Sequence, residues 1–184
     1  RVMTSAQSPD LRLGAWALAR RSHSPKHGDI VLFRLPSPRG RTPESLHLGR
    51  IVALPGDSIE LRAGRLVVNE EEVHDYRHEI NPSESYALRL PREGGVYPIT
   101  STNLVAYRSA LLEEQKLYPS APDEVALEGT DPKHWLKALA KNPYHTFRRD
   151  YYWVLTDQTQ AAPDSRHLGI LPADAILGIV LFSL

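Results

Sequence analysis

Short apolar runs separated by glycine and proline fill the first part of the sequence and limit the folds open to it. The runs are residues 15–20, 29–35, 48–54, 57–61 and 65–68. Turn residues such as Gly28, Pro36 and the pair Pro55-Gly56 lie between them. Several short strands at close spacing predict an antiparallel barrel or coiled sheet. Gly64 predicts a hairpin within residues 60–68, because glycine readily adopts positive φ angles.

The chain leaves this strand-rich pattern at about residue 74 and returns to it near residue 150. A helix is predicted over residues 103–117, capped by Ser101 or Thr102. A second helix is predicted over residues 132–141. Strands are predicted over residues 151–155 and 176–182, joined by a polar loop over 156–172. We therefore expect a mainly β domain formed by residues 1–73 and 150–184, with an α-containing insertion over 74–149.

Composition excludes several classes of function. Lysine and arginine together number 22, as do aspartate and glutamate, and this balance argues against a nucleic-acid partner. The chain has no cysteine, which excludes disulfides, thiol catalysis and a cysteine-built zinc site. No apolar run approaches the ~18 residues of a membrane-spanning helix. Because the sequence begins at Arg1 in mid-pattern, we expect an anchor or targeting segment upstream.

Four stretches, in order along the chain, resemble the signature boxes of the type I signal peptidases. Residues 28–33 (GDIVLF) and 50–57 (RIVALPGD) resemble the boxes GDIVVF and RVVGLPGD, and residues 8–14 lie where SMxPTLxxGD belongs. Asp157, residues 164–166 and Gly169 match the aspartates, arginine and last glycine of the terminal box. The segment from Tyr86 to Tyr107 is similar to an insertion of some Gram-negative members. The resemblance implies a signal-peptidase-like antiparallel β-domain with an inserted subdomain.

The resemblance also implies a set of chemical positions. The family uses a serine nucleophile and a lysine general base, whose pKa is lowered by burial in apolar surroundings. Aligned on their boxes, the serine position is Ala6 and the lysine position is Gly49. The position of the serine that orients the lysine is Ala162, and the oxyanion hydroxyl position is Thr4. Of these four positions, only Thr4 has a side-chain oxygen that could take part in the family's chemistry.

Three emptied positions on one scaffold predict a naturally non-cleaving paralogue in the bacterial secretion pathway. The matched residues interpreted as turn and ion-pair scaffold are Pro55, Gly56, Asp57, Asp164 and Arg166. The expected partners are signal peptides or secreted preproteins, the membrane surface, and an active signal peptidase or secretion assembly. We expect no cofactor and no metal. The resemblance places the domain on the periplasmic side of the inner membrane, held by an upstream anchor.

The family binds small side chains in shallow apolar pockets, with the extended peptide paired to exposed strands. The matching wall positions are Leu11, Ala17, Leu32 and Leu48. All four are apolar, so peptide binding could survive without cleavage. They would also be apolar as ordinary core residues, and the sequence leaves both interpretations open.

Two alternative functions are open on the sequence alone. An active peptidase could use a displaced serine, Ser5 or Ser8, although Lys26 lies in a turn expected to face solvent. A purely structural module could instead use the inserted subdomain as its contact surface.

Two further features have a functional and an ordinary interpretation. His74 and His78 have the i, i+4 spacing of metal ligands, but their polar surroundings favour exposed histidines. Residues 151–153 (YYW) could touch lipid, but an ordinary strand is the favoured interpretation.

Overall fold

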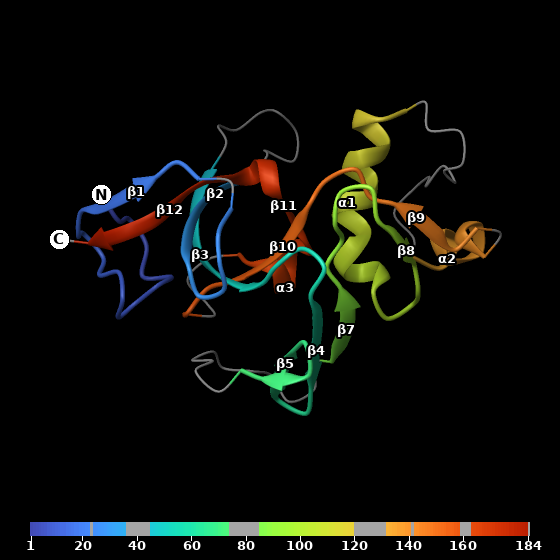
Figure 1. Ribbon diagram of the computed structural model, residues 1–184, viewed down its shortest axis with the longest axis horizontal. Coiled ribbons are helices and arrows are strands. Elements are labelled where there is room, and N and C mark those ends of the chain that lie inside the picture. Colours follow the sequence, from blue (N-terminus) through green and yellow to red (C-terminus); the bar gives the residue numbers. More distant parts are fainter. Residues whose placement is uncertain are drawn as a thin grey trace.

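Three antiparallel sheets form the framework of the described part of the chain (Figure 1). The computed structural model describes residues 1–22, 24–35, 45–73, 85–119, 132–140, 142–158 and 163–183. His74, His78 and Ala162 lie outside the described residues. Within these ranges strands outweigh helices, which confirms the prediction of a mainly β chain with antiparallel sheets.

The largest sheet carries the segments that match the family boxes. Its six strands have the order β1-β12-β2-β3-β10-β11. They are β1 (Ala17–Arg20), β2 (Ile30–Leu35), β3 (Ser45–Ala53), β10 (Tyr151–Leu155), β11 (Leu171–Pro172) and β12 (Ile176–Ser183). β3 lies inside this sheet, paired with β2 on one side and β10 on the other. Gly49 and Arg50 on β3 therefore have strands on both flanks.

A second sheet, of order β6-β5-β4-β7, forms a separate arm in Figure 1. Its strands are β4 (Ser58–Arg62), β5 (Arg65–Val68), β6 (Glu71–Glu72) and β7 (Tyr86–Arg89). The β4–β5 turn has φ angles of 50° at Ala63 and 77° at Gly64, as a two-residue primed hairpin requires. The predicted hairpin is confirmed.

The segment predicted as an insertion also contributes to this second sheet. β7 comes from residues 74–149 and pairs with β4. A third sheet joins β8 (Val96–Pro98) to β9 (Tyr144–Thr146). The division of the chain into two domains therefore remains a prediction.

The helices and the segment after β10 differ in part from the predictions. α1 spans Leu104–Leu117 and α2 spans Pro132–Leu139. The residue before α1 is Asn103 rather than Ser101 or Thr102, and its side chain makes no capping hydrogen bond to the helix. The predicted polar loop over 156–172 contains a short helix, α3 (Ser165–Leu168), and the strand β11, and a 3₁₀ turn spans Ala173–Ala175. The loop prediction was wrong there because Asp164 caps α3 by accepting from the Arg166 amide.

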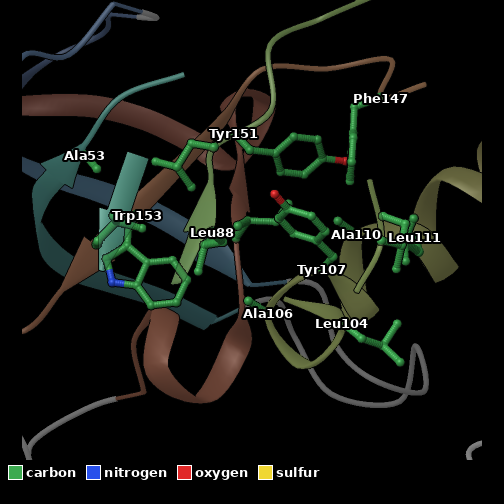
Figure 2. Close-up of a cluster of buried hydrophobic side chains, with 14 of the residues drawn as sticks. Ala53, Leu88, Leu104, Ala106, Tyr107, Ala110, Leu111, Phe147, Tyr151 and Trp153 are labelled. Carbon is green, nitrogen blue, oxygen red and sulfur yellow. The ribbon is translucent and has the colours of Figure 1, made fainter. Parts of the chain in front are cut away.

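A buried aromatic and aliphatic cluster joins α1 to strands β7 and β10 (Figure 2). Tyr107 and Leu111 of α1 pack in the same cluster as Leu88, Tyr151 and Trp153. Each such side chain contributes on the order of 1.5–3 kcal/mol by leaving water. Because Tyr151, Tyr152 and Trp153 are all buried, the lipid-contact interpretation of this strand is wrong. Within the described residues, no helix is long and apolar enough to cross a membrane.

Candidate functional site

The nucleophile position lies in the segment that precedes β1. Ala6 is fully buried, its amide donates to Thr4 Oγ1 over 3.1 Å, and its carbonyl accepts from the Gln158 amide over 3.0 Å. The bond from Gln158 ties the segment to the loop after β10. The methyl group of Ala6 can neither attack a carbonyl nor hold a proton, so this position has no nucleophilic function.

The base position is closed by neighbouring side chains. Gly49 lies on β3 opposite Val31 of β2. A Cβ atom placed on Gly49 would lie less than 3.0 Å from Val154 Cγ1 and 3.1 Å from Phe33 Cε1. Both Val154 and Phe33 are buried. A lysine here would need both side chains to move, and close-packed interiors resist such movement.

The side chain of Gln7, which follows the nucleophile position, and the base position both lie near the carbonyl oxygen of Leu155. Gln7 Nε2 donates to the Leu155 carbonyl oxygen over 3.4 Å. The same oxygen lies 3.5 Å from a Cβ atom placed on Gly49. Gln7 is fully buried, and its Oε1 has no hydrogen-bond partner among the described residues. The sequence gives no sign that Gln7 fills this region, because its neighbours come from β3 and β10.

Arg50, beside the emptied base position, ties three segments together. Its Nε and Nη2 bind the two carboxylate oxygens of Asp157 over 3.0 and 2.6 Å. Nη2 also reaches Asp10 over 2.6 Å, and Nη1 donates to the Gly28 carbonyl over 2.9 Å. The hydrogen bond to Asp157 is the main cause that raises the pKa of Arg50 further above its ordinary value. The bidentate contact therefore favours the charged form of Arg50 and orients the N-terminal segment.

Asp164 and Arg166 form the structural ion pair that the sequence predicts. Asp164 is fully buried and accepts from the Thr156 amide over 3.1 Å and from Arg166 Nε over 3.0 Å. Burial alone would raise the pKa of Asp164, but hydrogen bonds from Arg166 and Thr156 outweigh it and lower the pKa. The pair holds α3 against the end of β10.

Asp57 organises the turn after β3 in a similar way. Its carboxylate accepts from the Leu54 amide over 2.7 Å, from Asn69 Nδ2 over 2.8 Å, and contacts His27 Nε2 at 2.7 Å. Burial would raise the pKa of Asp57, but the bonds from Asn69, Leu54 and His27 together lower it. Gly56 has a φ of 90° in this turn, and the turn continues from Pro55. These contacts hold the turn together, and a purely structural role for Pro55, Gly56 and Asp57 remains a prediction.

The four predicted groove residues lie in one apolar cluster. Leu11 and Leu48 are buried, and the partly buried Ala17 and Leu32 pack against the same cluster together with Val2. Successive residues of a strand point to opposite faces of the sheet, so Leu48 and this cluster lie on the face opposite to the one where Val154 and Phe33 close the Gly49 position. Its role in binding peptide remains a prediction.

The residues considered for an active peptidase with a displaced serine are Ser5, Ser8 and Lys26, and they are poorly placed for catalysis. Ser5 and Lys26 are exposed and Ser8 is half-buried. The Lys26 amide is bound to Asp29 within its own turn, over 2.8 Å. Among the described residues no group of three or more His, Asp or Glu side chains could hold a metal ion.

Comparison with known proteins identifies the family. The family described as "Signal peptidase, peptidase S26" matches residues 1–184. The chain therefore belongs to the signal peptidase family, peptidase S26. It is 24% identical over 176 residues to "Signal peptidase I" of Buchnera aphidicola subsp. Baizongia pistaciae (strain Bp), which covers 87% of this chain and 55% of that relative. The chain thus spans about half the length of that relative.

A solved structure of a signal peptidase I from Enterococcus faecalis V583 is also similar to this chain. The match has 19% sequence identity and a TM-score of 0.37. It covers 85% of this chain and 96% of the solved chain.

Proposed function

We propose that this chain is a non-cleaving member of the signal peptidase family that binds signal peptides or secreted preproteins. The observation that carries the proposal is the filled base position. Gly49 has no side chain, and Val154 and Phe33 occupy the space that a lysine there would need. Ala6 at the nucleophile position removes the second reacting group. Loss of one such group alone costs an enzyme several orders of magnitude in rate.

The apolar cluster around Leu48 supports peptide binding. The side chains of Leu48 and Leu11 are buried, and those of Leu32 and Ala17 pack against them. An extended peptide with small residues near its cleavage site would place them against these side chains. Peptide capture without cleavage would suit a protein that assists an active signal peptidase or a secretion assembly.

An apolar surface at one end of the molecule supports a membrane-facing orientation. Large side chains, each more than half exposed, gather on the N-terminal segment and on the paired ends of β1 and β12. They are Met3, Leu13, Trp16, Leu18, Leu181 and Phe182. Figure 1 places both chain ends here, at the far side of the molecule from α2. Tryptophan and apolar residues favour the membrane interface. We place this end on the periplasmic surface of the inner membrane, with an anchor upstream.

An active peptidase with a displaced serine has less support. Ser5 is exposed in the segment before Ala6, while Lys26 is exposed in the turn before β2. A general base must lie within hydrogen-bond reach of the proton that it removes.

Binding of a synthetic signal peptide tests the proposal. The wild-type chain should bind the peptide, with affinity measured by calorimetry, and mass spectrometry should detect no product. Leu32→Asn places an amide in the apolar cluster and should weaken binding about tenfold or more. Leu32→Met keeps the volume and apolar character and is the matched control. Equal binding by both variants, with both folded, would show that the cluster is only core.

A further inference from the structure

Charge is unevenly distributed over this chain, although basic and acidic residues are equal in number, at 22 each. Residues 1–22 contain four arginines and a single acidic residue, Asp10, and residues 176–184 contain no charged side chain. The remainder of the chain therefore holds more acidic than basic residues. The two segments include β1 and β12, which pair at the end of the molecule where Figure 1 places both chain ends. One end of a formally neutral chain is thus basic.

The charge of these arginines is not balanced by neighbouring carboxylates. All four arginines are exposed, and they are Arg1, Arg12, Arg20 and Arg21. Asp10 binds Arg50 over 2.6 Å. Within the described part of the chain, no ion pair joins any of the four arginines to an acidic side chain. Their positive charge is therefore available to a partner.

Hydrogen bonds hold two of these arginines beside an exposed apolar side chain. The Ala15 amide donates to the Arg12 carbonyl over 3.1 Å, which closes a turn with Leu13 near its tip. Leu13 is 67% exposed. Arg1 Nε donates to the Gly14 carbonyl of the same turn over 3.0 Å. Arg1 and Arg12 therefore lie close to Leu13.

The other two arginines follow the apolar part of β1. Arg20 is the last residue of β1, and Arg21 comes directly after it. Two residues before Arg20, Leu18 pairs with Phe182 of β12, and both of these side chains are more than half exposed. Basic and apolar side chains thus share one end of the molecule.

We propose that this end selects anionic phospholipids, with its apolar side chains in the membrane interface and its arginines on the lipid phosphates. The inference rests on the membrane-facing orientation proposed above and adds the class of lipid. Apolar side chains alone would bind neutral and anionic bilayers alike. Each guanidinium group near an anionic surface strengthens binding about fivefold.

The same charges favour a lipid surface over a second copy of this chain. A symmetric dimer through this end would place the arginines of the two copies against each other, and like charges across an interface are unfavourable. An anionic bilayer presents the opposite charge to all four arginines and an apolar interior to the side chains between them.

Vesicle co-sedimentation tests the lipid preference. The purified chain is mixed with vesicles of phosphatidylcholine alone and with vesicles of equal parts phosphatidylcholine and phosphatidylglycerol. Binding to the anionic vesicles should be about tenfold tighter or more, and added sodium chloride should reduce this difference. Equal binding to both vesicles would overturn this inference and leave the apolar contact intact. Binding to neither would overturn the membrane-facing orientation as well.

Paired arginine variants test which charges are responsible. Arg12→Gln combined with Arg20→Gln leaves the apolar side chains in place and should weaken binding to anionic vesicles about twentyfold. Arg62→Gln combined with Arg65→Gln removes two exposed charges from the β4–β5 arm, away from the chain ends in Figure 1, and is the matched control. Equal losses in the two pairs would overturn the proposal, because net charge alone would then explain them.

A competition experiment separates a lipid surface from a site for free phosphate. Sodium phosphate and sodium chloride at the same ionic strength should release the chain from anionic vesicles equally, because screening depends on ionic strength. Stronger release by phosphate would indicate a discrete phosphate site and would overturn the lipid surface. Because no peptide is present, these results do not depend on whether the chain binds signal peptides.

Discussion

Val154 of β10 lies where a side chain on Gly49 of β3 would have to be. The two strands are neighbours in the six-stranded sheet, so neither residue can shift without disturbing the backbone hydrogen bonds between the strands. Val154 Cγ1 lies within 3.0 Å of the Cβ position that glycine leaves empty. At Gly49, the predicted base position, core side chains therefore occupy the space that a longer side chain would need.

A double-mutant cycle tests this packing. Gly49→Ala should lower the free energy of unfolding by about 1–3 kcal/mol, because the added methyl group overpacks the core. Val154→Ala opens space beside it. With both changes together, the loss should be smaller than the sum of the single losses, measured by urea unfolding. Strict additivity would mean that the two side chains do not compete for this space.

Acid should destabilise the chain partly through Asp164. Its folded-state pKa is lowered, so its stabilising contribution is present above the unfolded pKa of about 3.9 and is lost as pH falls through the folded pKa. Asp164→Asn should lower stability at neutral pH by about 3–5 kcal/mol, since Arg166 loses its partner. It should also flatten the decline in unfolding free energy below pH 4. An unchanged acid profile would contradict the lowered pKa.

Arg50 should control the order of the N-terminal segment. Arg50→Lys removes the bidentate contact with Asp157 while keeping the charge. Hydrogen exchange of the Leu11 amide, which bonds to the Gln7 carbonyl, should become about tenfold faster, corresponding to ~1.4 kcal/mol of lost protection. Arg65→Lys, on the exposed side of β5, is the control. Equal exchange in both variants would mean that Arg50 does not hold this segment.

The strand order could not be derived from the sequence, although many strands could be located in it. The alternation of apolar residues and turn signals identified β5 and the β4–β5 hairpin, because those signals are local. The helix within residues 156–172 was missed, because Asp164 and Arg166 look like loop residues until their contacts are known. Asn103 was missed as the residue before α1 because its side chain turns back to Pro98 and Thr100.

The candidate site was predictable only in part. The family boxes predict Ala6 and Gly49 as the nucleophile and base positions, since a missing functional group is visible in sequence, and this assignment stays a prediction. The side chains that fill the space beside Gly49 could not be predicted, because Phe33, Val154 and Gly49 come from three different strands.

The apolar end of the molecule should bind lipid. Replacing both Trp16 and Phe182 by serine should weaken binding to vesicles of phosphatidylethanolamine and phosphatidylglycerol about tenfold or more, because two large side chains no longer leave water. Val96→Ser changes an exposed apolar residue on β8 and is the control. Co-sedimentation measures the bound fraction. Equal loss in the control would show that this end is not the contact surface.

The absence of the family chemistry is tested most directly by incubating the purified chain with a synthetic precursor peptide that spans a signal-peptide cleavage site. Mass spectrometry should find the precursor intact after prolonged incubation, with the wild-type chain and with Ser5→Ala and Ser8→Ala alike. Cleavage by the wild-type chain that either substitution abolishes would contradict the proposal that this protein binds peptides without cutting them.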